Sequence, residues 1–210
     1  MPEFETSFEV EMRCHFQDPA EAYDTLPFLK SSIEREIGWV TRHYGLELFK
    51  AGQVLRMSEV IRPDGLQRYL GWKGPDIGTI ANIRQEIEED ITNGINGSVV
   101  LKTVGGNSDI STPEAAEQEL ARLGHGEFMS FHGRNLLGYD KDLGIATKLM
   151  NCPDLSWQFL VELEKMARTE KEARQCEVEL QELCVKFGLV NRLIREEPPT
   201  LLYTKKFGKG

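Results

Sequence analysis

Phe8-Glu9-Val10-Glu11-Met12-Arg13, near the start of the chain, alternates charged and apolar side chains. In a β-strand, side chains two positions apart lie on the same face. Such a strand has two carboxylates and a guanidinium on one face and apolar groups on the other. An antiparallel strand with one face in water has the same pattern, so this stretch alone does not decide the fold.

The pattern recurs at Ile83-Arg84-Gln85-Glu86-Ile87-Glu88-Glu89-Asp90 and at Phe159-Leu160-Val161-Glu162-Leu163-Glu164. Three strands with regularly placed carboxylates predict a shared polar interior. Strands of this kind suit a closed antiparallel barrel, whose apolar outer face is covered by helices. We therefore predict an α+β fold, mainly antiparallel β: a closed eight-stranded β-barrel with a charged lumen and helices packed outside.

Turn residues and hydrophobic spacing divide the chain into predicted elements. Asp18, Thr112 and Thr169 are candidate helix N-caps, and Pro63-Asp64-Gly65 is a hairpin turn. The predicted helices span 18–33, 112–124 and 169–187. The predicted strands span 6–16, 37–44, 52–61, 66–73, 80–91, 98–102, 127–137, 144–150, 156–166 and 200–204, and 205–210 is expected to be a loose tail.

Composition bounds the class of protein. The chain has 210 residues, 40% hydrophobic and 28% charged, which predicts one globular domain over 1–210. A net charge of −9 argues against nucleic-acid and anionic-membrane partners. The acidic start lacks a signal peptide and no apolar run has membrane-spanning length, so we expect a cytoplasmic protein. The four cysteines lack metal-ligand spacing and are expected to be reduced thiols.

Glu9-x-Glu11-x-Arg13 resembles the ExExK signature of the CYTH superfamily, the triphosphate tunnel metalloenzymes. Further segments follow in the order of that family, and the resemblance covers nearly the whole chain. It is strongest to the class IV adenylyl cyclases and weaker to thiamine triphosphatases. These segments are Val54-Leu55-Arg56, Trp72-Lys73-Gly74-Pro75, Arg84-x-Glu86-x-Glu88, Arg134 and 159–164.

The resemblance implies a triphosphate tunnel, and the residue types agree with that chemistry. A triphosphate carries about four negative charges and needs several cationic groups facing one place. The implied substrate-binding residues are Arg13, Arg56, Lys73, Arg84 and Arg134. Carboxylates suit Mg²⁺ or Mn²⁺, and the implied metal ligands are Glu9, Glu11, Glu162 and Glu164. The implied catalytic residues are Lys73, Glu86 and Glu88.

Several positions depart from the family pattern. Arg13 replaces the usual lysine, and Ser58 stands where a second arginine is common. Lys148 stands where many relatives have an aspartate, which would alter metal binding. The segment 92–110 has no family equivalent and is predicted to form a hairpin over the tunnel mouth. Arg56 and Arg134 also fit ordinary solvated strand positions.

Three readings of the function remain open. The first is an enzyme that binds ATP or inorganic triphosphate: adenylate cyclase-like, giving cyclic AMP and pyrophosphate, or a triphosphate hydrolase. The second is a nucleotide- or polyphosphate-binding module that has lost catalysis, which Ser58 and Lys148 favour. The third is a barrel scaffold whose charges pair internally. A homodimer is compatible with each of them.

Overall fold

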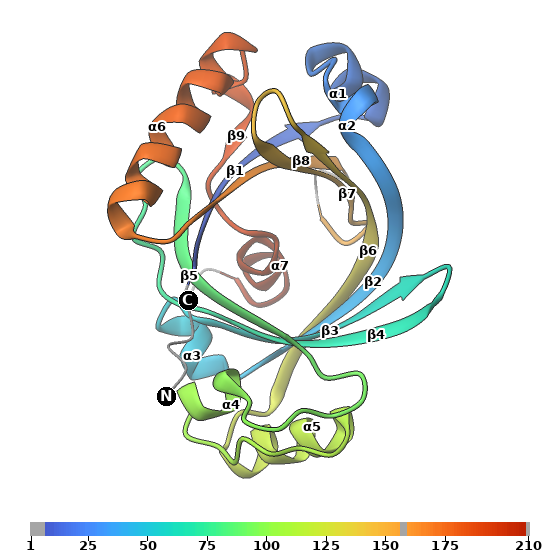
Figure 1. Ribbon diagram of the computed structural model, residues 1–210, viewed down its shortest axis with the longest axis vertical. Coiled ribbons are helices and arrows are strands. Elements are labelled where there is room, and N and C mark those ends of the chain that lie inside the picture. The colour runs from blue at the N-terminus through green and yellow to red at the C-terminus, as the bar shows by residue number, and fades with distance from the viewer. Residues whose placement is uncertain (1–6, 156–158, 209–210) are drawn as a thin grey trace. The chain divides into compact units, whose positions relative to one another are not determined.

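The computed structural model describes residues 7–155 and 159–208 (Figure 1). These residues divide into two compact units. Unit 1 contains 38–76 and 84–131, and unit 2 contains 7–37, 77–83 and 132–208. Strands β2, β5 and β6 each supply residues to both units. The single-domain assignment stays a prediction.

The strands form one antiparallel sheet whose order is β5-β4-β3-β2-β6-β7-β8-β1-β9. An additional β5–β1 pairing joins the first eight into a closed ring, and β9 pairs with β1. The predicted closed eight-stranded barrel is therefore confirmed. The strands are β1 Ser7–Phe16, β2 Ile33–Tyr44, β3 Val54–Arg62, β4 Gly65–Lys73, β5 Asn82–Asp90, β6 Glu127–Asp140, β7 Ile145–Asn151, β8 Phe159–Ala167 and β9 Leu193–Ile194.

The helices begin where the capping residues predict. Side chains of Asp18, Thr112 and Thr169 each accept a hydrogen bond from the backbone N–H three residues on. The helices are α1 Pro19–Thr25, α2 Leu29–Ser32, α3 Leu46–Lys50, α4 Val99–Thr103, α5 Pro113–Arg122, α6 Glu170–Lys186 and α7 Pro198–Phe207, with a 3₁₀ turn at Val190–Arg192.

The predicted helix over 18–33 is wrong in its length. It consists of α1 and α2, and Ile33 is already the first residue of β2. Pro27 explains the break, because a proline disfavours the helical conformation of the residue before it. Leu26 accordingly leaves helical geometry, with φ −123° and ψ 75°. The short helix α3 was not predicted.

The segment 92–110 does not form the predicted hairpin. Residues 98–102 were expected to be a strand, but Ser98 caps α4 and accepts a hydrogen bond from the Leu101 N–H. Val100 and Leu101 are buried in the apolar core of unit 1, together with Ile91 and Ile110. The run of apolar residues is too short there for the sequence to distinguish a strand from one turn of buried helix.

The C-terminal prediction is also corrected. The expected strand 200–204 lies inside α7, and so do residues 205–207 of the expected loose tail. Pro198 starts this helix, where a missing N–H costs nothing. Three parts of the predicted elements lie outside the described residues: Thr6 of the first strand, residues 156–158 of the strand 156–166, and residues 209–210 of the tail.

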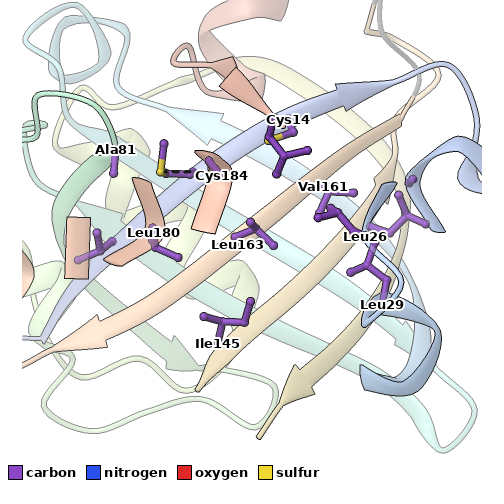
Figure 2. Packing of buried hydrophobic residues seen from close by; sticks show 14 of the residues in the cluster. Cys14, Leu26, Leu29, Ala81, Ile145, Val161, Leu163, Leu180 and Cys184 are labelled. Atoms are coloured by element: carbon purple, nitrogen blue, oxygen red, sulfur yellow. Dashed lines mark hydrogen bonds between the residues drawn. The ribbon is translucent and has the colours of Figure 1, made fainter. Parts of the chain in front are cut away.

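The core of unit 2 joins the apolar face of β1 and β8 to α6. Figure 2 shows Leu180 and Cys184 of α6 with Leu163 of β8 and Cys14 of β1 in this buried cluster. All four cysteines are free, as predicted. Among the described residues, no helix has the length and hydrophobicity to cross a membrane.

Glu177 of α6 holds the loop before β5. Its buried Oε1 accepts hydrogen bonds from the N–H groups of Thr79, Ile80 and Ala81, at 2.7–3.0 Å. Burial would raise the pKa of Glu177, but these hydrogen bonds lower it. The neighbouring Gly78 has no room for a side chain, because an added Cβ would lie 2.0 Å from the Ala81 carbonyl oxygen.

Glu177→Ala is expected to lower the free energy of unfolding by about 1–3 kcal/mol, because the N–H of the buried Ala81 is left unpaired and a buried unpaired donor costs roughly that amount. Urea unfolding followed by circular dichroism measures the change. Glu182→Ala, at an exposed position of the same helix, is the control and should unfold like the wild type. Equal midpoints for the two variants would contradict this role of Glu177.

Candidate functional site

The polar face of unit 2 carries a row of charges across three strands. The register places Arg13 of β1 and Lys148 of β7 opposite Glu162, on either side of it. Arg13 Nε lies 3.0 Å from Glu162 Oε1, and Lys148 Nζ contacts Glu162 Oε2. Glu162, which is buried, therefore has a cation at each of its two oxygens.

Every nitrogen of the Arg13 guanidinium is engaged, and the residue is only 2% exposed. Besides Nε, Nη1 donates to Asn82 Oδ1 at 2.6 Å. Nη2 lies 2.5 Å from Glu11 Oε2 and 3.4 Å from Glu197 Oε1. The alternation seen in the sequence is thus confirmed, since Glu11 and Arg13 share a face.

Carboxylates outnumber cations in this unit 2 cluster. It contains five carboxylates (Glu9, Glu11, Glu162, Glu164 and Glu197) and two cations (Arg13 and Lys148), a formal surplus of three negative charges. Burial would lower the pKa of Arg13 and of Lys148, but the surrounding carboxylates raise both. Burial would raise the pKa of Glu162, which Lys148 and Arg13 instead hold well below its usual range.

The arrangement of this cluster does not fit a divalent cation. Both oxygens of Glu162 are taken by Arg13 and Lys148. In the part of the chain that the structure describes, no three His, Cys, Asp or Glu side chains are placed to hold a metal. The predicted ligands Glu9, Glu11, Glu162 and Glu164 do surround the two cations, and their role as metal ligands stays a prediction.

A second group of charges lies in unit 1, on β3, β4 and β5. Arg56 lies opposite Gly71, and a Cβ there would come within 3.2 Å of Arg56 Nε. The missing side chain thus lets Arg56 cross β4. Its Nη2 lies 2.9 Å from Glu86 Oε1 and 3.0 Å from Glu88 Oε2. Lys73 Nζ is 3.5 Å from Glu86 Oε2.

The structure thus brings together Arg56 and the three predicted catalytic residues, Lys73, Glu86 and Glu88. Lys73 is buried, whereas Arg56 is partly accessible. Arg84, also buried, donates from Nη1 to the carbonyls of Gly52 and Gly74, both at 2.6 Å. Arg84 therefore fixes the backbone on which this unit 1 cluster is built.

Arg134 is not brought to the unit 2 cluster. Its side chain is 77% exposed and lies 3.4 Å from Glu36. The next residue, Asn135, is the buried one. Because strand side chains alternate, Arg134 and Asn135 point to opposite faces. Arg134 thus lies on the face opposite to the buried Asn135, and its role in substrate binding stays a prediction.

The buried polar residues that were not singled out from the sequence include His43, Asn82 and Glu197. His43 lies opposite Arg56, and neither ring nitrogen has a hydrogen-bond partner among the described residues. Burial, with Arg56 nearby, lowers the pKa of His43 to about 3, so the ring is neutral. The sequence holds a signal for His43, because it stands two residues after Thr41 and the two side chains share a strand face. Thr41 Oγ1 contacts Ser58 Oγ at 3.0 Å on that face.

No protein family model matches the sequence. No curated protein matches it either. Solved structures do match in fold. The protein PH1819 from Pyrococcus horikoshii OT3 has a TM-score of 0.72 at 19% identity, with 94% of this chain and 99% of that chain covered.

Two other matches carry a described activity. A candidate adenylate cyclase from Vibrio parahaemolyticus has a TM-score of 0.64 at 15% identity, covering 93% of this chain and 97% of that one. A candidate adenylyl cyclase from Hippeastrum, with a dominant triphosphatase activity, has a TM-score of 0.57 at 14% identity, covering 96% and 97%. The chain has the fold of these proteins. The fold implied by the CYTH resemblance is thereby confirmed, and the reaction is a separate question because one fold hosts several chemistries.

Proposed function

We propose that this protein is an enzyme that cleaves a phosphoanhydride bond of a small-molecule triphosphate. The observation that carries the proposal is the burial of Arg13 and Lys73 on strand faces lined by other charged side chains. Burying a charge is costly, and an apolar core would be the less costly filling. Cationic groups held in fixed positions suit a ligand with several negative oxygens.

In this proposal the unit 1 cluster neutralises charge on the phosphate chain. Lys73 and Arg56 donate to phosphoryl oxygens, and Glu86 and Glu88 hold the Arg56 guanidinium in place. Cations fixed before the reaction stabilise developing charge without reorganising during it. In cyclisation the ribose 3′-oxygen bonds to the α-phosphorus of ATP and pyrophosphate leaves. In hydrolysis a water oxygen bonds to a phosphorus instead, the bridging P–O bond of the phosphoanhydride breaks, and phosphate leaves while the proton of the water passes to solvent.

Product analysis tests the proposed function. Purified protein is incubated with ATP or with inorganic triphosphate, with and without Mg²⁺ or Mn²⁺, and the products are separated by ion exchange. Cyclic AMP with pyrophosphate identifies a cyclase, and orthophosphate identifies a phosphohydrolase. Tripolyphosphate binding without any product would favour the binding module, in agreement with the pairing of Lys148 and Glu162.

Lys73→Met is expected to lower kcat by about 100-fold, because it removes one positioned cation while keeping the aliphatic stem. The matched control is Lys50→Met, at an exposed lysine of the same unit whose partner is Glu47. Steady-state rates with the substrate found above measure both. If Lys73→Met has the same rate as the control, Lys73 has no role in the reaction.

A further inference from the structure

Most of the N–H groups of the Arg13 guanidinium are already engaged. A guanidinium carries five N–H groups on three nitrogens, and four contacts occupy them: Nε with Glu162, Nη1 with Asn82, and Nη2 with Glu11 and Glu197. This inference rests on the proposed function and on the sequence-based expectation that Arg13 is one of the substrate-binding residues. A phosphate can bind Arg13 through two parallel N–H groups only if one of the present partners moves away.

The partners of Arg13 differ in how firmly they are held. Glu11 and Glu162 belong to the paired strands β1 and β8, and they lie 2.5 and 3.0 Å from Arg13. Asn82 follows the loop that Glu177 holds. Glu197 precedes α7 and belongs to none of the eight strands of the ring, and its contact with Arg13 is the longest at 3.4 Å. Glu197 is thus the partner that can leave without breaking a pairing between strands of the ring, at the cost of the short β1–β9 pairing.

The segment that carries Glu197 is attached to the rest of unit 2 through a short strand and the Arg195 side chain. It consists of β9, whose two residues pair with β1, followed by residues 195–197. Arg195 is exposed and donates to the carbonyls of Gly78 and Thr79. Figure 1 shows that α6 and α7 lie on opposite sides of β1, so this segment reaches the polar face. Release of this segment breaks the pairing of β9 with β1 and the Arg195 contacts, and it leaves the pairings within the ring of eight strands intact.

The charge balance also singles out Glu197. The unit 2 cluster has four carboxylates on β1 and β8 for its two cations, and Glu197 adds a fifth. This carboxylate increases the repulsion among the acids, while its oxygen makes the contact with Arg13 that a phosphoryl oxygen makes equally well. A carboxylate at this position is a substitute for an anionic ligand.

We propose that Glu197 occupies the phosphate position at Arg13, and that a bound triphosphate displaces it together with the segment 193–198. The C-terminal segment is then an internal competitor of the substrate. Triphosphate binding at Arg13 and docking of Glu197 at Arg13 exclude each other, so each of them lowers the equilibrium population of the other.

The test compares Glu197→Gln with Glu196→Gln, an exposed neighbour, by calorimetric titration with inorganic tripolyphosphate. Glu197→Gln is expected to bind about tenfold more tightly than the wild type, the scale of one charge-assisted hydrogen bond. Glu196→Gln should match the wild type. In the wild-type protein, tripolyphosphate should also increase hydrogen exchange across residues 193–207, a readout that needs no variant.

The outcomes separate the two proposals. In one outcome, the wild type binds tripolyphosphate, Glu197→Gln binds it no more tightly, and hydrogen exchange in 193–207 does not rise. This outcome overturns the inference and leaves the proposed function standing. If neither protein binds, both are overturned. If Glu197→Gln does not fold, the exchange measurement on the wild type decides alone.

Discussion

Glu162→Gln is expected to lower the free energy of unfolding by about 3–5 kcal/mol, the cost of removing one partner from a buried ion pair. The variant leaves Arg13 and Lys148 without the carboxylate that now lies between them. The glutamine amide keeps the shape of the glutamate side chain and one acceptor oxygen, so the loss of stability measures the effect of the charge. Urea unfolding at pH 7 measures it, with Glu182→Gln at an exposed site as the control.

The same variant should change how stability depends on pH. Since Lys148 and Arg13 lower the pKa of Glu162 in the folded protein, its ionised form stabilises the fold above the unfolded pKa, roughly 4.3. That contribution is lost as the pH falls through the lowered folded value. The difference between wild type and Glu162→Gln should therefore narrow below about pH 4. A difference that stays constant down to pH 2 would rule out the charge as its cause.

Lys148→Asp is expected to create a metal site on the polar face of unit 2. The substitution frees one oxygen of Glu162 and adds a hard carboxylate ligand beside it. Mn²⁺ should then stabilise the variant far more than the wild type, by about 2.7 kcal/mol when free metal exceeds Kd 100-fold. Thermal unfolding across a Mn²⁺ titration measures this shift.

The control for this substitution is Lys141→Asp, which makes the same change at an exposed turn residue. It should respond to Mn²⁺ as the wild type does. Equal Mn²⁺ stabilisation of all three proteins would show that Lys148 does not exclude a metal from the cluster. Loss of the fold in Lys148→Asp without metal and its recovery with Mn²⁺ would agree with the prediction.

The ring of strands could be predicted because its signal is local. Charged and apolar residues alternate at period two in β1, β5 and β8, and the capping residues of α1, α5 and α6 stand at their expected positions. The errors arose where tertiary packing decides. Residues 98–102 are apolar enough for a strand, but they form a helix because their side chains fill the core of unit 1.

The site was predicted in part for a similar reason. The strand registers bring together the four residues of the unit 1 cluster, Arg56, Lys73, Glu86 and Glu88. The alternation of charged and apolar residues in the sequence predicts that they share a face. Glu197 could not be found in this way, because it follows a two-residue strand and its partner lies 184 positions earlier. The sequence alone does not decide between Arg134 and Asn135 for the polar face, because a shift of one residue moves a strand side chain to the opposite face.

Ile95 and Ile110 exchange two backbone hydrogen bonds, each 2.9 Å long, at the base of the segment that contains α4. This pair closes a loop whose ends are adjacent, so its length can change without moving the strands on either side. At its tip, a side chain on Gly105 would meet no atom within 4 Å. A binding peptide or a fluorescent domain inserted after Gly105 would extend into open space, which makes this turn the natural attachment point for following the protein in cells.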